Sequence, residues 1–441
     1  MQFELDNQTI KDLELLGDGK LNDSIFSFYN RTKTLGGKAC LLKLMENPLT
    51  DLEQLKRRSR LIKYIASIDL ELQINSNQLD FIDAYTRLNI PSLRNNWVDA
   101  FFQHLSYRLK PQNDYYLIQA SIQQLIYLIK EVKQLVGSEF HNAPKEFTQL
   151  IDELKLFITH KEIKAIDLDN DRIGFKNINR FDCIFRKKYK HELIRFIEII
   201  YLLDVYISIG NVAKEECLAF VEYADSSTPS ISIEALHHPL LPNAVPYDVQ
   251  INESNNLCFL TGPNMAGKST FLKSLGIAVY ISHLGFPVPA KKMITSVYNG
   301  IITTLNLSDN MNRGYSHFYS EVKRVKKAAI KLKEKNRLFV IFDELFRGTN
   351  VKDAFDASLL IIESFAQINK STFCVSTHIT EVAEQLKQLK NIEYKYFDSK
   401  LVNGKPTYSY ELKNGVSHER LGMHIVRNED IVEILSSITK N

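Results

Sequence analysis

The stretch that decides the fold is Leu257-Cys258-Phe259-Leu260-Thr261-Gly262-Pro263-Asn264-Met265-Ala266-Gly267-Lys268-Ser269-Thr270. It joins an apolar run to a loop with the spacing G-x-x-x-x-G-K-S, and an amphipathic segment follows from Thr270. Glycines let such a loop turn several backbone N–H groups toward one point, and the helix that follows adds the positive end of its dipole. The stretch therefore predicts a phosphate-binding loop rather than an ordinary strand-to-helix turn.

The loop and a later acidic pair together predict a reaction. We expect Lys268 to contact the β- and γ-phosphates of ATP, and the Ser269 hydroxyl to bind the bridging Mg²⁺. An apolar run ends in Asp343-Glu344 about 75 residues further on. Asp343 is expected to help hold Mg²⁺, and Glu344 to polarise the water that attacks the γ-phosphate. Hydrolysis is therefore favoured over transfer to a second small substrate.

A third polar element, Ser376-Thr377-His378, follows the next apolar run. Open α/β sheets bind ligands at the carboxyl ends of their strands, which is where these residues are expected to lie. His378 is therefore a candidate for sensing the γ-phosphate or orienting the water. The alternative for His378 is an ordinary hydrogen-bonded loop residue.

Bulk properties limit the class of protein. The chain has 441 residues, 44% of them hydrophobic and 24% charged, which suits an ordinary soluble protein of two or three domains. Its net charge of +3 is too small to indicate nucleic-acid binding by itself. The five cysteines lack C-x-x-C spacing, which favours a reduced, cytoplasmic setting. We expect no secretory signal and no membrane role, because the most apolar helical stretch is short and contains Asp204.

The composition of the sequence changes near Ser226-Ser227-Thr228-Pro229, which marks a domain boundary. Residues 1–228 have helical periodicity and predict an all-α domain, with connections at 66–91 and 163–182. Residues 229–441 alternate short buried strands with helices and predict an α/β P-loop NTPase domain. A hairpin around Asn403-Gly404 and a short terminal helix near residues 430–435 are expected in its tail. The other strands are expected at 257–261, 301–305, 338–342 and 371–376, and the helices at 316–335, 351–368 and 380–389.

The motifs resemble those of the ATPase domain of the MutS family of DNA mismatch-repair proteins. The matching segments are Thr261 to Thr270, Asp343-Glu344-Leu345-Phe346-Arg347-Gly348-Thr349 and Thr377-His378. Gly314 to Glu321 is similar to the family's S-x-F-x-x-E signature, and His238-Pro239 to its R-H-P entry. The chain departs from the family pattern at Ala266, where Gly is more usual, and at His237, which replaces Arg. The resemblance implies an ABC-like, MutS-type ATPase fold.

The resemblance extends upstream, to the family's helical core or lever domain. Leu5 to Ile10 with Leu13-Glu14, then Thr34-Leu35-Gly36-Gly37, look like its opening, and Leu203-Asp204 through Ala213 looks like its returning long helix. Because Met1 already lies near the start of that domain, we expect the mismatch-reading and connector domains to be missing. The resemblance thus supports ATP binding more directly than mismatch recognition.

Family membership also implies partners. The ATPase domains of the family pair, and the signature segment of one subunit completes the nucleotide site of the other. Here that would place Ser316, at a predicted helix N-terminus, against the γ-phosphate of a second copy in a homodimer. The alternative for Ser316 is a simple N-cap. Tyr247 precedes the phosphate loop in the region where the family contacts adenine, and is a candidate for stacking on the base.

Contact with DNA rests on local charge and on the family. Clusters of Lys and Arg side chains neutralise DNA phosphates in some proteins and form only a solvated helix face in others. Trp97 and the other aromatic residues are assigned to the core. Two hypotheses remain: an ATPase coupled to binding of mismatched or branched DNA, and an ATP-switched dimerisation or interaction module that acts on a protein or RNA partner. The basic clusters are Lys56-Arg57-Arg58 with Arg60, Arg186-Lys187-Lys188 with Lys190, and Lys323, Arg324, Lys326, Lys327, Lys331, Lys333, Lys335 and Arg337.

Overall fold

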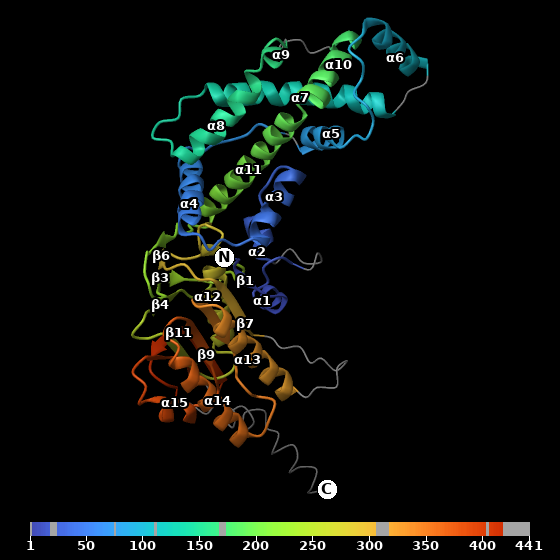
Figure 1. Cartoon of the computed structure of the whole chain (residues 1–441). Helices are drawn as coiled ribbons and strands as arrows, with labels where there is room; N and C mark the ends of the chain where they lie inside the picture. The colour runs from blue at the N-terminus through green and yellow to red at the C-terminus, as the bar shows by residue number, and fades with distance from the viewer. Residues whose placement is uncertain are drawn as a thin grey trace. The chain divides into compact units, whose positions relative to one another are not determined.

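The computed structural model describes residues 2–17, 24–74, 76–109, 113–166, 173–305, 317–402 and 405–417. The chain forms two compact units, and many of their elements are labelled in Figure 1. Unit 1 comprises Met1–Phe28, Asn47–Ser59 and Glu216–Asn441, and unit 2 comprises Tyr29–Glu46 and Arg60–Glu215. The expected single boundary near residue 228 therefore differs from the observed division, because two N-terminal segments belong to the same unit as the C-terminal half.

Unit 1 is built on a seven-stranded sheet in the order β1-β7-β8-β9-β5-β10-β11. Its strands pair in parallel except for the antiparallel hairpin β10–β11, as the sequence predicts for a largely parallel sheet. The four predicted central strands are confirmed, and every residue in them is buried. The strands are β1 (Glu4–Leu5), β5 (Leu257–Thr261), β7 (Gly300–Thr304), β8 (Leu338–Phe342), β9 (Thr372–Ser376), β10 (Ile392–Val402) and β11 (Lys405–Asn414).

Helices cover both faces of this sheet. Alternate residues of β8 show this, because successive side chains of a strand point to opposite faces. Val340 belongs to the same hydrophobic cluster as residues of α13 (His317–Glu334), α14 (Val351–Ala366) and α15 (Glu381–Leu386). Its neighbour Ile341 faces α12 (Lys268–Ser282), where a Cβ on Gly276 would lie 3.1 Å from Ile341 Cδ1. The loop before α12 thus lies at the carboxyl edge of a sheet that is packed on both sides.

A second, four-stranded sheet completes unit 1 in the order β2-β6-β3-β4. Strands β3 and β4 are antiparallel, and β6 pairs with β3 and with β2. Its members are β2 (Glu222–Tyr223), β3 (Ile231–Leu236), β4 (Tyr247–Ile251) and β6 (Lys292–Thr295).

Unit 2 is helical, as the periodicity of the sequence predicts. Two of its helices lie where connections were expected: α5 (Ser76–Thr86) and α10 (Phe175–Asp182), the latter followed by a π-helix at Cys183–Lys188. The many Asn and Asp residues there mask an apolar face, of which Leu79 and Ile82 in α5 are buried members. The other helices are α3 (Leu35–Glu46), α6 (Trp97–Leu109), α7 (Asn113–Gly137), α8 (Lys145–Ile158), α9 (Lys161–Lys164) and α11 (Lys190–Glu215).

Two sequence motifs that are far apart in the chain meet inside unit 2. Asp204 of α11 is buried and accepts hydrogen bonds from Lys33 N at 3.0 Å, Thr34 N at 3.1 Å and Thr34 Oγ1 at 2.7 Å. A Cβ on Gly37 would lie 2.3 Å from Asp204 Oδ2, so glycine is required at this close approach. The buried carboxylate therefore fixes the start of α3 on α11.

Three further helices lie in the N-terminal part of the chain: α1 (Asn7–Asp12), which belongs to unit 1, and α2 (Ile25–Tyr29) and α4 (Leu52–Ser67), in each of which the chain passes from unit 1 to unit 2. The expected hairpin is confirmed by the pairing of β10 with β11, although Asn403 and Gly404 lie outside the described residues. The expected terminal helix near residues 430–435 also lies outside them. Among the described helices, none combines the length and the apolar composition needed to cross a bilayer.

Candidate functional site

The loop between β5 and α12 has the backbone conformation that its glycines permit. Gly262 has φ 140°, Met265 has φ 68° and Gly267 has φ 113°. A Cβ on Gly262 would lie 2.8 Å from the carbonyl oxygen of Phe397 in β10, so a larger residue would clash there. Gly267 is the N-cap of α12 and provides no side-chain cap. The first N–H groups of a helix have no intrahelical partner, which suits this loop to an anion.

Lys268 is folded into the loop that precedes it. Its Nζ donates to the carbonyl oxygens of Gly262 at 2.8 Å and Pro263 at 3.1 Å, and its side chain is only 4% exposed. Burial lowers the pKa of Lys268, while the carboxylates of Glu344 and Asp343 act in the opposite direction. The loop therefore holds a buried cation on its own carbonyls, 4.0 Å from Glu344 Oε1.

Asp343 follows the last residue of β8 and is held by two hydroxyl groups. Ser269 Oγ donates to Asp343 Oδ2 at 2.5 Å, and Ser376 Oγ donates to Oδ1. Burial raises the pKa of Asp343, and the two hydroxyl donors oppose that rise. Mg²⁺ prefers oxygen ligands and is usually bound through one or two protein groups together with phosphate oxygens. The adjacent oxygens of Ser269 and Asp343 fit such an ion.

Glu344 has a left-handed backbone conformation, with φ 54°. Its N–H is fixed by Ser376, whose carbonyl oxygen and Oγ each lie 3.1 Å away. Its carboxylate accepts a hydrogen bond from Arg347 Nη1 at 3.2 Å and its side chain is 17% exposed. Backbone conformations of this kind persist only where the surroundings impose them. Ser376 thus holds both the side chain of Asp343 and the backbone of Glu344.

These residues share one cavity of about 370 Å³. Loop and helix residues form one wall, the acidic segment after β8 forms another, and Leu305 and Tyr410 complete it. The residues lining it include Asn264, Met265, Gly267, Lys268, Ser269, Thr270, Asp343, Glu344 and Arg347.

Two candidates from the sequence are not among the described residues that line the cavity, and a third is not described. His378 is exposed and is not among the described residues that line the cavity. Tyr247 is 5% exposed and packs edge-on against Phe271 and Phe397, with ring centroids 5.3 and 5.8 Å away. It therefore packs on side chains of α12 and β10 and is not among the described residues that line the cavity. Ser316 lies outside the described residues.

The structure adds residues that sequence reasoning did not assign. Ser376 belonged to a recognised polar element, but only its contacts show that it holds Asp343 and Glu344. Arg347 lay in a recognised motif and had no role there. Tyr410 had no motif signal, because only the pairing of β10 with β5 brings the β10–β11 hairpin beside the loop. It is the aromatic residue that lines the cavity among those described, and it is 44% exposed.

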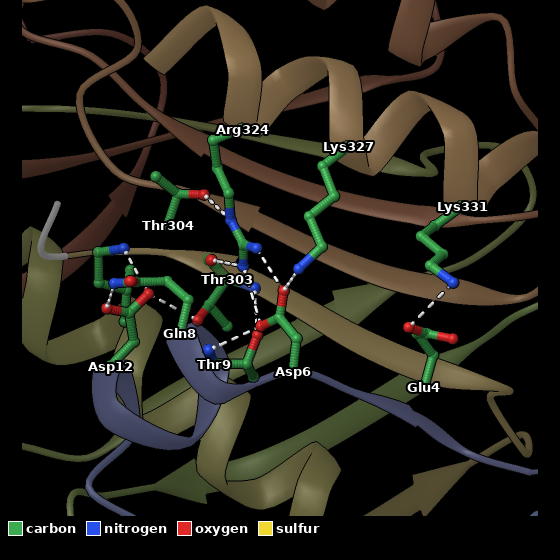
Figure 2. A network of polar contacts seen from close by, with 11 residues as sticks. Glu4, Asp6, Gln8, Thr9, Asp12, Thr303, Thr304, Arg324, Lys327 and Lys331 are labelled. Carbon is green, nitrogen blue, oxygen red and sulfur yellow. Dashed lines mark hydrogen bonds and ion pairs between the residues drawn. The ribbon is translucent and has the colours of Figure 1, made fainter. Parts of the chain in front are cut away.

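Three basic residues of α13, Arg324, Lys327 and Lys331, pair with acidic residues of the N-terminal segment, as Figure 2 shows. The guanidinium of Arg324 binds the carboxylate of Asp6, and its Nε donates to Thr304 Oγ1 at 3.2 Å. Burial favours a higher pKa for Asp6, but hydrogen bonds from Arg324 and Lys327 hold it well below its usual range. Arg324, Lys327, Lys331 and Lys335 thus form ion pairs with Asp6 and Glu4, which engages part of this basic cluster within unit 1.

The other two basic clusters are also partly engaged. The side chain of Arg186 is 6% exposed and pairs with Asp182 at 2.7 Å, and Lys188 pairs with Glu162. Arg58 Nη1 donates to the carbonyl oxygen of Leu284 at 2.9 Å. In contrast, Trp97 is 58% exposed, so its assignment to the core is wrong. Exposed basic side chains remain at Arg57, Lys187, Lys190, Lys326 and Lys333.

Comparisons with known proteins match both halves of the chain. The model of MutS domain III matches residues 8–210, and the model of MutS domain V matches residues 258–439. A DNA mismatch repair protein MutS from Bacillus mycoides (strain KBAB4) is 29% identical over 309 residues, which are 68% of this chain and 33% of that protein. The protein of the same name from Geobacillus sp. (strain WCH70) is 26% identical over 306 residues, 67% of this chain and 34% of that protein. The chain thus spans about a third of the length of these relatives.

Proposed function

Because the chain belongs to the MutS family, we propose that it binds ATP with Mg²⁺ in the cavity of unit 1, hydrolyses it, and couples hydrolysis to binding of DNA. In this proposal unit 1 is a P-loop NTPase of the ABC-like, MutS type, and unit 2 is the helical core or lever. The observation that carries it is the gathering of Lys268, Ser269, Asp343 and Glu344 around one cavity.

Binding begins with an exchange of partners at Lys268. Its amine lies on the carbonyl oxygens of Gly262 and Pro263, and phosphate oxygens would take their place as acceptors. Charged hydrogen bonds to phosphate are stronger than those to neutral carbonyls, so the exchange favours the nucleotide. The N–H groups at the start of α12 add further donors. Tyr410 offers an exposed ring for the base, and Tyr247 packs against Phe271 of α12.

Hydrolysis would use Glu344 as the general base. Its carboxylate lies at the cavity and its backbone is fixed by Ser376, so a water hydrogen-bonded to it would be held in one position. Glu344 would accept the proton of that water as its oxygen attacks the γ-phosphate. Arg347 must release the carboxylate first, because its guanidinium binds the same group. Bound Mg²⁺, held by Ser269 and Asp343, would neutralise charge on the phosphates.

The remaining parts of the proposal concern assembly and setting. The chain would form a homodimer in which Ser316 of one copy completes the nucleotide site of the other, with His378 near the γ-phosphate. The DNA bound would be mismatched or branched, as in mismatch repair or recombination. A reduced, cytoplasmic setting suits its five cysteines, of which Cys258 and Cys374 are buried.

A second function is favoured by one specific observation. Several basic residues that were candidates for DNA contact form internal ion pairs, among them Arg324 and Arg186. This supports the alternative of an ATP-switched dimerisation or interaction module that acts on a protein or RNA partner.

The experiment that tests both combines nucleotide and DNA. Binding of a fluorescent ATP analogue and release of phosphate are measured first, with and without Mg²⁺. Binding of homoduplex, mismatched and branched DNA is then titrated with salt at fixed ATP. We expect Mg²⁺-dependent hydrolysis and a DNA affinity that depends on nucleotide and falls with salt. Hydrolysis without nucleotide-dependent DNA affinity would favour the interaction module, and a chain that retains no nucleotide would contradict the whole proposal.

A further inference from the structure

We infer that Asp12, in the N-terminal segment, is a positioning residue for Asp343. The inference rests on the proposed function, because it concerns the carboxylate that would hold Mg²⁺. It assigns a role in the site to a segment that lies outside every nucleotide-binding motif of the sequence.

The contacts of Asp12 end on the last residues of β7. Asp12 is 2% exposed, and its Oδ2 accepts hydrogen bonds from Thr303 Oγ1 at 2.8 Å and from Leu305 N at 2.9 Å. Its other oxygen accepts from Gln8 Nε2 at 2.8 Å. Figure 2 shows this carboxylate beside Thr303. Leu305 is the residue through which β7 reaches the cavity wall.

A second side chain of the same helix holds the main chain just before this point. Thr9 is fully buried, and its Oγ1 accepts a hydrogen bond from Thr303 N at 3.0 Å. Hydroxyl and carboxylate oxygens of α1 therefore take the place of strand carbonyls along the outer edge of β7, beyond the two residues that β1 pairs. Thr304 therefore lies between two residues, Thr303 and Leu305, whose N–H groups are both bound by side chains of α1.

Thr304 in turn holds Asp343. Its carbonyl oxygen accepts a hydrogen bond from Asp343 N at 2.9 Å, immediately after the last paired residues of the two strands, Thr304 and Phe342. Asp12 is thus connected to the candidate metal ligand through one peptide group. Its carboxylate binds the N–H of Leu305, and the carbonyl oxygen of the same peptide, that of Thr304, binds the N–H of Asp343. Groups that orient a metal ligand in this way commonly matter for metal affinity even though they do not touch the metal.

Two substitutions of Asp12 differ in the hydrogen bonds that they remove. In Asp12→Asn the amide oxygen can still accept from Thr303 and Leu305, whereas the amide nitrogen cannot accept the hydrogen bond from Gln8. In Asp12→Ala both donors are left buried without a partner, so the end of β7 relaxes. Glu14→Gln is the matched control: Glu14 belongs to the same segment, pairs with Lys273 at 2.8 Å, and makes no bond to β7 among the described contacts.

The test measures the affinity for Mg²⁺ rather than the rate of ATP hydrolysis. Each variant is titrated with Mg²⁺ while it binds a fluorescent, non-hydrolysable ATP analogue, and binding of the analogue in EDTA is measured separately. For Asp12→Ala we expect roughly tenfold more Mg²⁺ at half-saturation, the lower end of the range for outer contacts of a metal site, and unchanged binding in EDTA. Asp12→Asn and Glu14→Gln should titrate like the wild type. Amide exchange at Leu305 should accelerate in Asp12→Ala alone.

Failure of this inference can be distinguished from failure of the proposed function. A folded Asp12→Ala that titrates like the wild type overturns the inference, and so does an equal loss in Asp12→Asn or Glu14→Gln. Should Asp12→Ala be insoluble, Thr9→Val decides in the same way: a smaller shift to higher Mg²⁺ supports the inference, and an unchanged titration overturns it. Failure of the wild type to bind the analogue at all would instead remove the proposed function.

Discussion

Lys268 Nζ and the carbonyl oxygen of Gly262 lie 2.8 Å apart, so the lysine closes the loop from which it extends. Because the amine is nearly fully buried there, the free loop already has the cation in place, and a nucleotide needs to exchange only its partners. This arrangement favours binding of phosphate at small conformational cost.

Lys268→Met tests that arrangement. The aliphatic stem is retained while the cation is lost, so we expect the affinity for the fluorescent ATP analogue to fall by roughly ten- to a hundredfold, the worth of one charged hydrogen-bonding group. Thermal unfolding should show no large loss of stability, because Asp343 keeps the hydroxyl groups of Ser269 and Ser376 and Glu344 keeps Arg347. Lys273→Met, one turn further along α12, should bind the analogue normally. Unchanged affinity in Lys268→Met would exclude Lys268 from the phosphate site.

Glu344→Gln separates binding from hydrolysis. The amide keeps the size of the side chain but cannot accept a proton, so we expect phosphate release to slow by roughly 10²–10⁴-fold while analogue binding is retained. The matched control is Glu384→Gln, which removes an exposed carboxylate paired with Lys387 in α15. Hydrolysis at the wild-type rate in Glu344→Gln would remove Glu344 as the base.

His283 makes stability depend on pH. It is fully buried between the carbonyl oxygen of Leu49 and the N–H of Tyr298, and burial lowers its pKa to about 4. The unfolded chain, with the ordinary pKa, binds a proton more readily. The free energy of unfolding should therefore be fully retained above the ordinary pKa of 6.5 and fall as the pH drops toward 4, by up to about 1.4 kcal/mol per unit.

Urea unfolding at about pH 7, 5.5 and 4.5 measures this slope. The slope contains a similar contribution from His238, whose pKa burial also lowers to about 4. His283→Gln should be less stable at neutral pH but should lose less stability on acidification. An identical slope in the variant would show that His283 is not the group that titrates.

Asp6 holds the N-terminal segment on α13. Asp6→Asn leaves the guanidinium of Arg324, 7% exposed, without its anion, so we expect a loss of roughly 3 kcal/mol in unfolding free energy. Arg324→Met in the same chain should restore part of that loss, because an apolar pair leaves no buried charge. Limited proteolysis near β1 should follow the same order. Simple additivity of the two substitutions would mean that the pair does not interact.

The one tryptophan of the chain reports on α6 without labelling. Trp97 is 58% exposed and stacks on Phe101 with ring centroids 6.0 Å apart. Its fluorescence should therefore be quenched strongly by acrylamide in the folded protein, with only a modest further increase in urea. Weak quenching that rises sharply on unfolding would place Trp97 in a covered position.

The elements that the sequence predicts well are those with a local pattern. The runs at β5, β7, β8 and β9 are apolar throughout, and strands buried on both faces have that composition. The loop motif predicted a sharply turning backbone, and the positive φ values at Gly262 and Gly267 agree with it. Lys268, Ser269, Asp343 and Glu344 were expected in one site, and they line one cavity.

The features that were missed depend on contacts between distant residues. Strand β1 has only two residues, too few for any periodicity. The basic residues of α13 looked like a solvated or phosphate-binding face because their partners, Glu4 and Asp6, lie more than 300 residues away in the chain. Tyr410 reaches the cavity only because a hairpin lies beside β5. No local pattern encodes such pairings.

The edge of the seven-stranded sheet has a practical consequence. An uncovered edge strand is a template for pairing with another molecule, and in unit 1 the outer edge of β7 is occupied by β1 and by the oxygens of Thr9 and Asp12. Clipping the first dozen residues, or straining them with a bulky fusion, would leave that edge open to intermolecular pairing and precipitation. Purification handles therefore belong at the other terminus.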